Sequence, residues 1–162
     1  MPISTIGSAG LTTAGIAQTN LGTNVAGNGP SFQATNSSTQ SLSSGVFTKA
    51  LLNSESWDTN SNFDTTLYRF TPNAAGYYQF NTYFYYGTAN SYEMITILFK
   101  NGASLGTYLA DSITPASRAV NGSRLAYMNG TTDYMEMYVY INVAASITAG
   151  NLLFEGFMVR AA

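Results

Sequence analysis

The sequence contains no cysteine and no histidine. Without cysteine the chain has no disulfide, no thiolate metal site and no thiol nucleophile. Without histidine it lacks the commonest general base and the commonest metal ligand of proteins. It also lacks a Gly-x-Ser-x-Gly elbow, a Ser-x-x-Lys pair and a phosphate-binding loop. These absences exclude much catalytic chemistry and favour a structural or binding function.

Charge is scarce as well. Six Lys and Arg and eight Asp and Glu make up 9% of the 162 residues, and the net charge is −2. An ordinary globular protein has about 25% charged residues. A weakly acidic chain is not drawn to nucleic acid or to an anionic membrane. No apolar run approaches the roughly 18 to 20 residues of a spanning helix, so we expect neither a nucleic-acid partner nor membrane insertion.

Aromatic residues are what the sequence has in quantity, with 12 Tyr, 9 Phe and one Trp. They are densest in residues 68–86, which predict two strands separated by a turn at Pro72 to Gly76. From Tyr78 to Tyr86 the even positions are aromatic except for Thr82, so one face of this strand suits a core. The odd positions suit a wet or partner-facing surface.

Period-two alternation and turn residues predict further strands. They cover residues 32–34, 46–52, 94–100, 103–109, 123–128, 134–141 and 154–159. The Asn101-Gly102 pair is the strongest short-range signal for a β-hairpin. Residues 57–64 and 111–122 are expected to be loops. The length and this pattern predict one all-β domain from residue 31 to residue 162.

The aromatic stretch resembles the C1q/TNF-like jelly-roll family. The family pattern has an aromatic–Asp pair, then Phe, then Gly six residues later, followed by alternating aromatics. The matching residues here are Phe63-Asp64, Phe70, Gly76, Tyr78 and Phe80. Lys100-Asn101-Gly102 and the closing FEGFMV of residues 154–159 match two further family segments. Leu67-Tyr68 replaces the family's usual Thr-Gly, so the turn there is expected to differ.

The resemblance covers residues 32–159 and implies a jelly-roll sandwich that assembles as a homotrimer. It assigns four aromatic residues to the trimer interface or the core: Tyr78, Phe80, Phe154 and Phe157. A chain with so much aromatic area and so little charge also favours oligomerisation, because monomers rarely expose large apolar patches. Four further tyrosines lie on the opposite strand faces, and both a core position and a contact surface fit them: Tyr83, Tyr85, Tyr138 and Tyr140.

Residues 1–30 carry no charge and only widely spaced apolar side chains, so they cannot form a core of their own. They are either disordered or ordered only against a partner. We expect them to form a short extended arm that attaches the domain to a larger particle. The candidate attachment residues are Ile3, Ile6, Leu11, Ile16 and Leu21. With no Lys or Arg before Lys49, the arm does not look like a secretory signal.

The acidic residues are the remaining candidates for chemistry. Asp58, Asn60 and Asn62 imitate the start of a calcium loop, but Phe63 and Arg69 occupy the positions of its glycine and glutamate, so Asx-turns are the favoured interpretation. A calcium site with oxygen ligands at a trimer axis remains an alternative. Any two carboxylates could form a glycosidase pair, although Glu136 and Glu155 are more simply solvent-side residues or partners of Arg124 and Arg160. We expect no cofactor, no resident metal and no catalytic residue.

The resemblance extends to C1q-like modules on bacteriophage virions. It implies a non-catalytic, trimeric knob on the capsid or tail surface, held to other virion proteins by residues 1–30 and contacting host-surface carbohydrate or protein. Such a protein is made in the host cytoplasm and resides at the virion surface. Two alternatives stay open: a secreted C1q/TNF-like binding module and a carbohydrate-cleaving tail enzyme.

Overall fold

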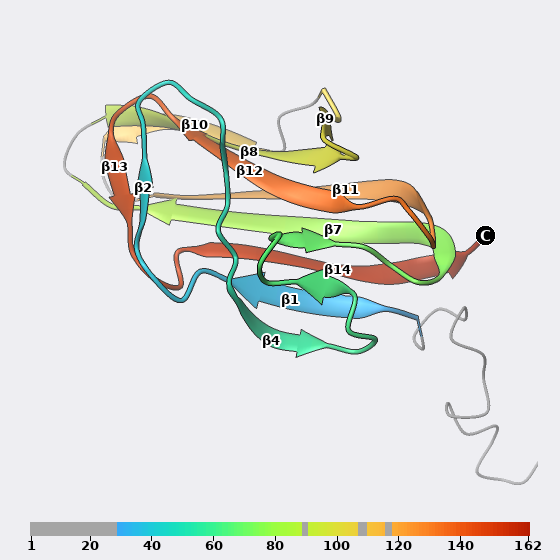
Figure 1. Ribbon diagram of the computed structural model, residues 1–162. Helices are drawn as coiled ribbons and strands as arrows, with labels where there is room; N and C mark the ends of the chain where they lie inside the picture. The colour runs from blue at the N-terminus through green and yellow to red at the C-terminus, as the bar shows by residue number, and fades with distance from the viewer. Residues whose placement is uncertain (1–28, 89–90, 107–109, 116–117) are drawn as a thin grey trace, which may run out of the picture.

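The computed structural model describes residues 29–88, 91–106, 110–115 and 118–162, and this part of the chain consists of β-strands and their connections without a helix (Figure 1). Most strands belong to two antiparallel sheets that pack face to face. The all-β prediction is confirmed.

The first sheet has five strands in the order β11-β7-β14-β1-β4. Their bounds are β11 Arg118–Asn129, β7 Ala75–Tyr86, β14 Leu152–Ala161, β1 Ser31–Thr35 and β4 Ser54–Asp58. The central strand is therefore the closing strand of the chain, beside the opening strand. Figure 1 shows the long strands β7, β11 and β14 running side by side.

The second sheet has seven strands and follows the order β10-β8-β12-β6-β5, with β3 paired to β12 and β9 paired to β8. The bounds of these strands are β3 Thr48–Lys49, β5 Phe63–Asp64, β6 Arg69–Phe70, β8 Ser91–Lys100, β9 Ala103–Ser104, β10 Ala110–Pro115 and β12 Met135–Ile141. A separate pair joins β2 Gln40–Leu42 to β13 Ala145–Ile147. Consecutive strands β6, β7 and β8 alternate between the two main sheets, which is a jelly-roll connection.

The core between the sheets is built on stacked aromatic rings. Phe32 on β1 stacks on Phe70 on β6 with ring centroids 4.3 Å apart, which joins the two sheets directly. Phe70 also meets the edges of Tyr78 at 5.7 Å and Phe80 at 6.1 Å. The aromatic residues that carry the family resemblance are therefore packing residues, and their spacing reflects the need to fill one shared core.

The predicted strands of residues 68–86 are present, with the turn between them. They do not pair with each other, because β6 lies in the seven-stranded sheet while β7 pairs with β11 and β14 in the other. The expected loop at residues 111–122 is wrong: the segment contains β10 and the first part of β11. Both are edge strands, so an alternating apolar face was not needed to hold them.

Two of the remaining segments also differ from expectation. Residues 46–52 form only the two-residue strand β3, and residues 57–64 contain the end of β4 and all of β5 around a short turn. Tyr68, in the place of a family glycine, has a φ of 53° and so adopts the left-handed conformation that glycine would favour.

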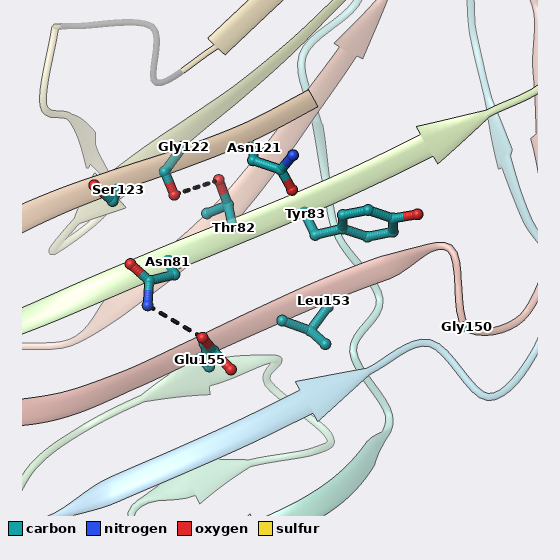
Figure 2. A pocket seen from close by; sticks show the side chains of 9 residues that line it. All are labelled: Asn81, Thr82, Tyr83, Asn121, Gly122, Ser123, Gly150, Leu153 and Glu155. Atoms are coloured by element: carbon teal, nitrogen blue, oxygen red, sulfur yellow. Dashed lines mark hydrogen bonds between the residues drawn. The ribbon is translucent and has the colours of Figure 1, made fainter. Parts of the chain in front are cut away.

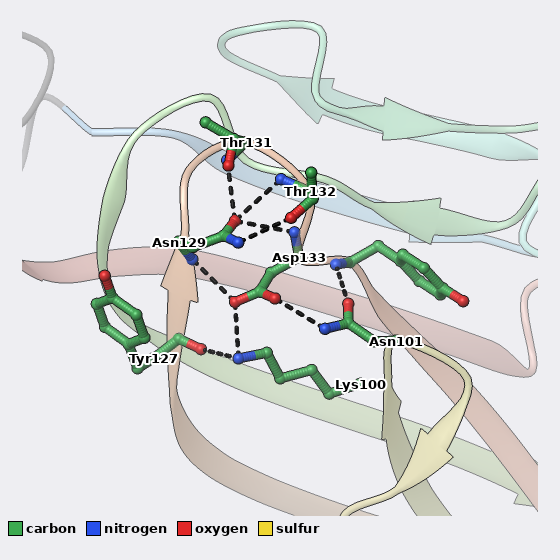
Figure 3. Close-up of polar contacts among 8 residues, drawn as sticks. Lys100, Asn101, Tyr127, Asn129, Thr131, Thr132 and Asp133 are labelled. Atoms are coloured by element: carbon green, nitrogen blue, oxygen red, sulfur yellow. Dashed lines mark hydrogen bonds and ion pairs between the residues drawn. The ribbon is translucent and has the colours of Figure 1, made fainter.

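The Asn101-Gly102 hairpin is confirmed, since both residues have positive φ, 53° and 76°, as a type I′ turn requires. This turn is tied to the β11–β12 turn by Asp133 (Figure 3). The carboxylate of Asp133 accepts hydrogen bonds from Asn101 Nδ2 at 2.7 Å and the backbone N of Asn129 at 3.0 Å, and pairs with Lys100 Nζ at 2.7 Å. Two turns far apart in sequence are thereby fixed at one end of the sandwich.

Candidate interaction surface

The outer face of the five-stranded sheet, which points away from the core, gathers exposed apolar side chains. Six of the nine large hydrophobic residues exposed in the described part of the chain lie on strands of this sheet: Trp57, Tyr77, Leu125, Tyr127, Phe157 and Val159. On β7, exposed Tyr77 precedes fully buried Tyr78, so the alternation of the strand places them on opposite faces. Exposed apolar patches of this kind mark interaction sites.

The register of the strands arranges these side chains in rows. Gln79 on β7 lies between Phe157 on β14 and Leu125 on β11, and Tyr77 pairs with Tyr127. The rings of Tyr77 and Tyr127 meet edge to face with centroids 5.6 Å apart. Leu125 is 53% exposed and Phe157 46% exposed, so the row offers area that a partner would bury.

A polar row crosses the centre of the same face. Glu155 on the central strand β14 lies between Gln33 on β1 and Asn81 on β7. Its carboxylate accepts a hydrogen bond from Gln33 Nε2 at 2.8 Å and another from Asn81 Nδ2 at 3.1 Å, the second of which is drawn in Figure 2. No cation pairs with Glu155 among the side chains that the structure describes. Two amides therefore orient a carboxylate whose charge is not neutralised by any side chain that the structure describes.

An open depression of about 610 Å³ lies over this polar row (Figure 2). It is lined by Asn81, Thr82, Tyr83, Asn121, Gly122, Ser123, Gly150, Leu153 and Glu155. Most of these side chains are polar, and Tyr83 and Leu153 supply the apolar part. The outer face thus combines an apolar end, toward Tyr77 and Tyr127, with a hollowed polar end.

The structure separates the four aromatic residues predicted as interface or core. Tyr78, Phe80 and Phe154 lie inside the sandwich with no exposed surface, and Tyr78 Oη donates a hydrogen bond to the carbonyl of Ala74 at 2.8 Å. Within one chain these three are core residues, and only Phe157 offers area that another subunit could contact. Burial raises the pKa of Tyr78, so its hydroxyl stays protonated as this hydrogen bond requires.

The sequence assigned four tyrosines neither to the core nor to a contact surface, and all four are partly buried in the structure. Tyr83 lines the depression on the outer face, and Tyr85 follows it on the same face of β7. Tyr138 and Tyr140 lie on the seven-stranded sheet, where the Tyr138 ring stacks on Phe99 at 4.0 Å. Desolvation, and then the nearby charge of Glu136, raise the pKa of Tyr138.

Most carboxylates whose side chains are described serve local structure. Asp58 accepts hydrogen bonds from the backbone N of Asn60 at 3.3 Å and of Phe63 at 2.7 Å, which confirms the Asx-turn interpretation. Glu136 is buried and pairs with Lys49, so neither of its alternatives holds, a solvent-side position or pairing with Arg124 or Arg160. Glu155 is partly exposed on the outer face, in agreement with its solvent-side alternative, and its carboxylate accepts hydrogen bonds from two amides of the same chain. In the described part of the chain no three acidic residues gather as a metal site would require.

The pKa of Asp133 reflects its network. Burial alone would raise the pKa of this carboxyl, but hydrogen bonds from Lys100, Asn101 and the Asn129 backbone outweigh burial and hold the pKa below its ordinary value. The pKa of Asp64 is also lowered, first by a hydrogen bond from the Thr66 hydroxyl and then by backbone hydrogen bonds.

The candidate attachment residues Ile3, Ile6, Leu11, Ile16 and Leu21 lie outside the described residues. The described chain begins at Gly29, and the buried Pro30 already contacts the domain, since its carbonyl accepts a hydrogen bond from the backbone N of Met158 at 3.1 Å. No helix long and apolar enough to cross a membrane occurs in the described ranges.

The sequence matches no family model and no curated protein. Solved structures do match. The globular domain of zebrafish complement 1qA protein aligns over 82% of this chain and 98% of its own, with a TM-score of 0.60 and 16% identity. Murine APRIL aligns over 80% of this chain and 98% of its own, with a TM-score of 0.55 and 10% identity.

A third structure, Eiger TNF from S. frugiperda, covers 82% of this chain and 92% of its own, with a TM-score of 0.55 and 9% identity. Identities this low bear on the fold alone. Three solved structures of this fold align with about four fifths of the chain, and the strand order also indicates a jelly roll. The chain has the C1q/TNF-like jelly-roll fold.

Proposed function

We propose that the protein is a homotrimeric, non-catalytic jelly-roll knob on the surface of a bacteriophage particle. The observation that carries the assembly is the apolar end of the outer face, where Tyr77, Tyr127, Leu125 and Phe157 stand exposed on neighbouring strands. Such a patch is uncommon on a monomer and typical of a subunit interface.

Cyclic symmetry fits this patch. A patch that meets its own copy gives a dimer, whereas a patch that meets a different region of the next copy closes into a ring such as a trimer. The outer face of β11, β7 and β14 suits the second mode, because the two main sheets leave edge strands that can lie against it. The C1q and TNF folds of the solved neighbours support a trimer.

The particle role is supported by the sequence. Residues 1–30 are uncharged and unable to form a core, as expected for an arm that becomes ordered against other virion proteins. The resemblance to C1q-like virion modules supports other virion proteins as partners of the arm and the capsid or tail as the position of the knob. Thirty residues extend at most about 100 Å, which favours a short projection over a long fibre.

The absence of catalysis is supported by the carboxylates. Asp58, Asp64, Asp133 and Glu136 accept hydrogen bonds or ion pairs that fix turns and strands, and each would have to give these up to act as an acid or base. Glu155 also accepts two hydrogen bonds, but it faces the open depression. Among the residues that the structure describes, no second carboxylate lines that depression, so they do not assemble a glycosidase pair there.

The test is to locate the protein on intact particles. Phage particles purified from the host are labelled with an antibody against residues 29–162 and viewed by electron microscopy. Labelling at capsid or tail supports the proposal, and a chain that begins at Gly29 should fold but fail to join the particles. Protein found only in the culture medium, with none on particles, would contradict the proposal.

That second outcome would favour a secreted binding module. The observation in its favour is the fold shared with the complement 1qA globular domain and with TNF proteins. In that case the outer face would still form the trimer, and the function would be ligand recognition by the remaining surface.

A further inference from the structure

Glu155 occupies the centre of the outer face, and no described cation pairs with it. It lies on the middle strand of the five-stranded sheet and is oriented by two amide donors, Gln33 and Asn81. A carboxylate accepts about four hydrogen bonds, so roughly two acceptor positions remain. If the outer face is covered in the trimer, as proposed above, this charge is buried and needs a partner, because an unpaired buried charge is costly.

In a cyclic trimer the partner must come from a different part of the neighbouring subunit. The five-stranded sheet offers two edges, β4 and β11. The β4 edge carries Glu55 and Asp58, which would place like charges against Glu155. The β11 edge carries Arg124, which forms no ion pair with any side chain that the structure describes. Charge complementarity therefore selects the β11 edge.

The level of the two residues along the strands agrees with this choice. We take the threefold axis of the proposed trimer to run along the strands, and rotation about such an axis keeps each residue at its own level. Arg124 pairs with Phe80 on β7 and Glu155 pairs with the next residue, Asn81, so their levels differ by one step, about 3.4 Å. Arg160 pairs with Tyr77, four steps from Asn81 or about 13 Å away, and does not match.

We propose that Arg124 of one subunit binds Glu155 of the next, which gives three equivalent ion pairs around the trimer. The guanidinium can donate two parallel hydrogen bonds to a carboxylate, and the two amides of Gln33 and Asn81 hold that carboxylate in place. The exposed apolar side chains of the outer face supply the affinity between subunits. The ion pair determines that the β11 edge docks on this face, and it fixes the position of that edge along the strands. This inference rests on the proposed trimer.

Cysteine cross-linking tests the contact directly, because the natural chain has no cysteine. The variant R124C/E155C cannot close a disulfide within one chain. The two residues are two strands apart, about 9.6 Å, and on opposite faces of the sheet, whereas a disulfide needs Cα atoms within about 7 Å. We expect covalent dimers and trimers on a non-reducing gel after mild oxidation, and their loss on reduction.

The matched control is R160C/E155C, which keeps the cysteine at position 155 and places the second cysteine at a level along the strands that does not match it. On the same gel this variant and each single-cysteine variant should run as one chain. Equal cross-linking of the control pair, or no cross-linking of R124C/E155C in a protein of trimeric mass, would overturn the assignment.

Charge exchange provides a second measurement that does not depend on oxidation. Arg124→Glu and Glu155→Arg should each raise the trimer dissociation constant at least tenfold, and R124E/E155R should recover most of that loss. Circular dichroism confirms folding of each variant. If single variants and wild type assemble equally well, Arg124 and Glu155 do not meet. If wild type itself has the mass of one chain, the proposed trimer is what fails.

Discussion

Replacing Asp133 with Asn should loosen the junction of the two turns. The substitution keeps the size of the side chain but removes its charge, and its amide nitrogen must face one of the donors that now point at a carboxylate oxygen. Those donors are Lys100 Nζ and Asn101 Nδ2, both at 2.7 Å, and the backbone N of Asn129 at 3.0 Å.

The expected loss follows from these contacts. A hydrogen bond to a charged group contributes about 1.5–3 kcal/mol, and Asn retains a neutral acceptor for part of the network. The Asp133 side chain is only 11% exposed, so water does not replace the lost bonds fully. We expect D133N to lower the free energy of unfolding by about 2–3 kcal/mol, an amount typical of a broken buried network.

Urea denaturation at a fixed protein concentration measures this difference. The matched control is T131A on the same turn, where the backbone N of Thr131, not its side chain, bonds Asn129. The control should unfold within about 0.5 kcal/mol of wild type, as surface substitutions do. A D133N variant as stable as T131A would refute the role of the carboxylate.

The same network predicts a dependence on pH. The pKa of Asp133 is lower in the folded chain than its ordinary value of 3.8, so the folded state favours the charged form. Its contribution is complete above that value and is lost as the pH falls below 3.8 and through the folded pKa. The stability difference between wild type and D133N should therefore shrink in that range.

The remaining predictions concern the core, the arm and metal. Tyr78→Ala should cost about 3–5 kcal/mol in urea unfolding, because it empties a fully buried site and leaves the Ala74 carbonyl without its donor; a loss under about 1 kcal/mol would contradict that packing. A chain beginning at Gly29 should melt within a few degrees of the full chain, and a fall of tens of degrees would show that residues 1–28 belong to the fold. EDTA should leave the melting curve unchanged, whereas a large drop restored by calcium would reveal an oxygen-ligand site.

The sequence was sufficient to predict the strands with one apolar face. Residues 78–86 and 135–141 alternate strictly, and both became long strands of the sandwich. The Asn101-Gly102 turn was predictable for a local reason, since both positions need positive φ. Family spacing pointed to Tyr78, Phe80, Phe154 and Phe157 as interface or core but did not separate the two, and the structure buries the first three and exposes Phe157.

Edge strands and the outer face were not predictable in the same way. Strands β10 and β11 lie at sheet edges, where one flank of the backbone is unpaired and an apolar face is not required, so residues 111–122 looked like a loop. Grouping Trp57, Glu155 and Leu125 on one face needs the strand order, which joins segments that are up to about a hundred residues apart. The odd positions of β7, which lie on the face away from the core, were a usable signal, but only the fold shows what lies beside them.

The mass of the purified protein in solution tests the trimer most directly. Light scattering coupled to size exclusion, at micromolar concentration, should give about 52 kDa, the mass of three chains of 17.3 kDa. Replacing Phe157 and Leu125 with Ser should move the mass toward one chain without loss of β structure, because both side chains are about half exposed in the single chain. A wild-type mass of 17.3 kDa at that concentration would contradict the account.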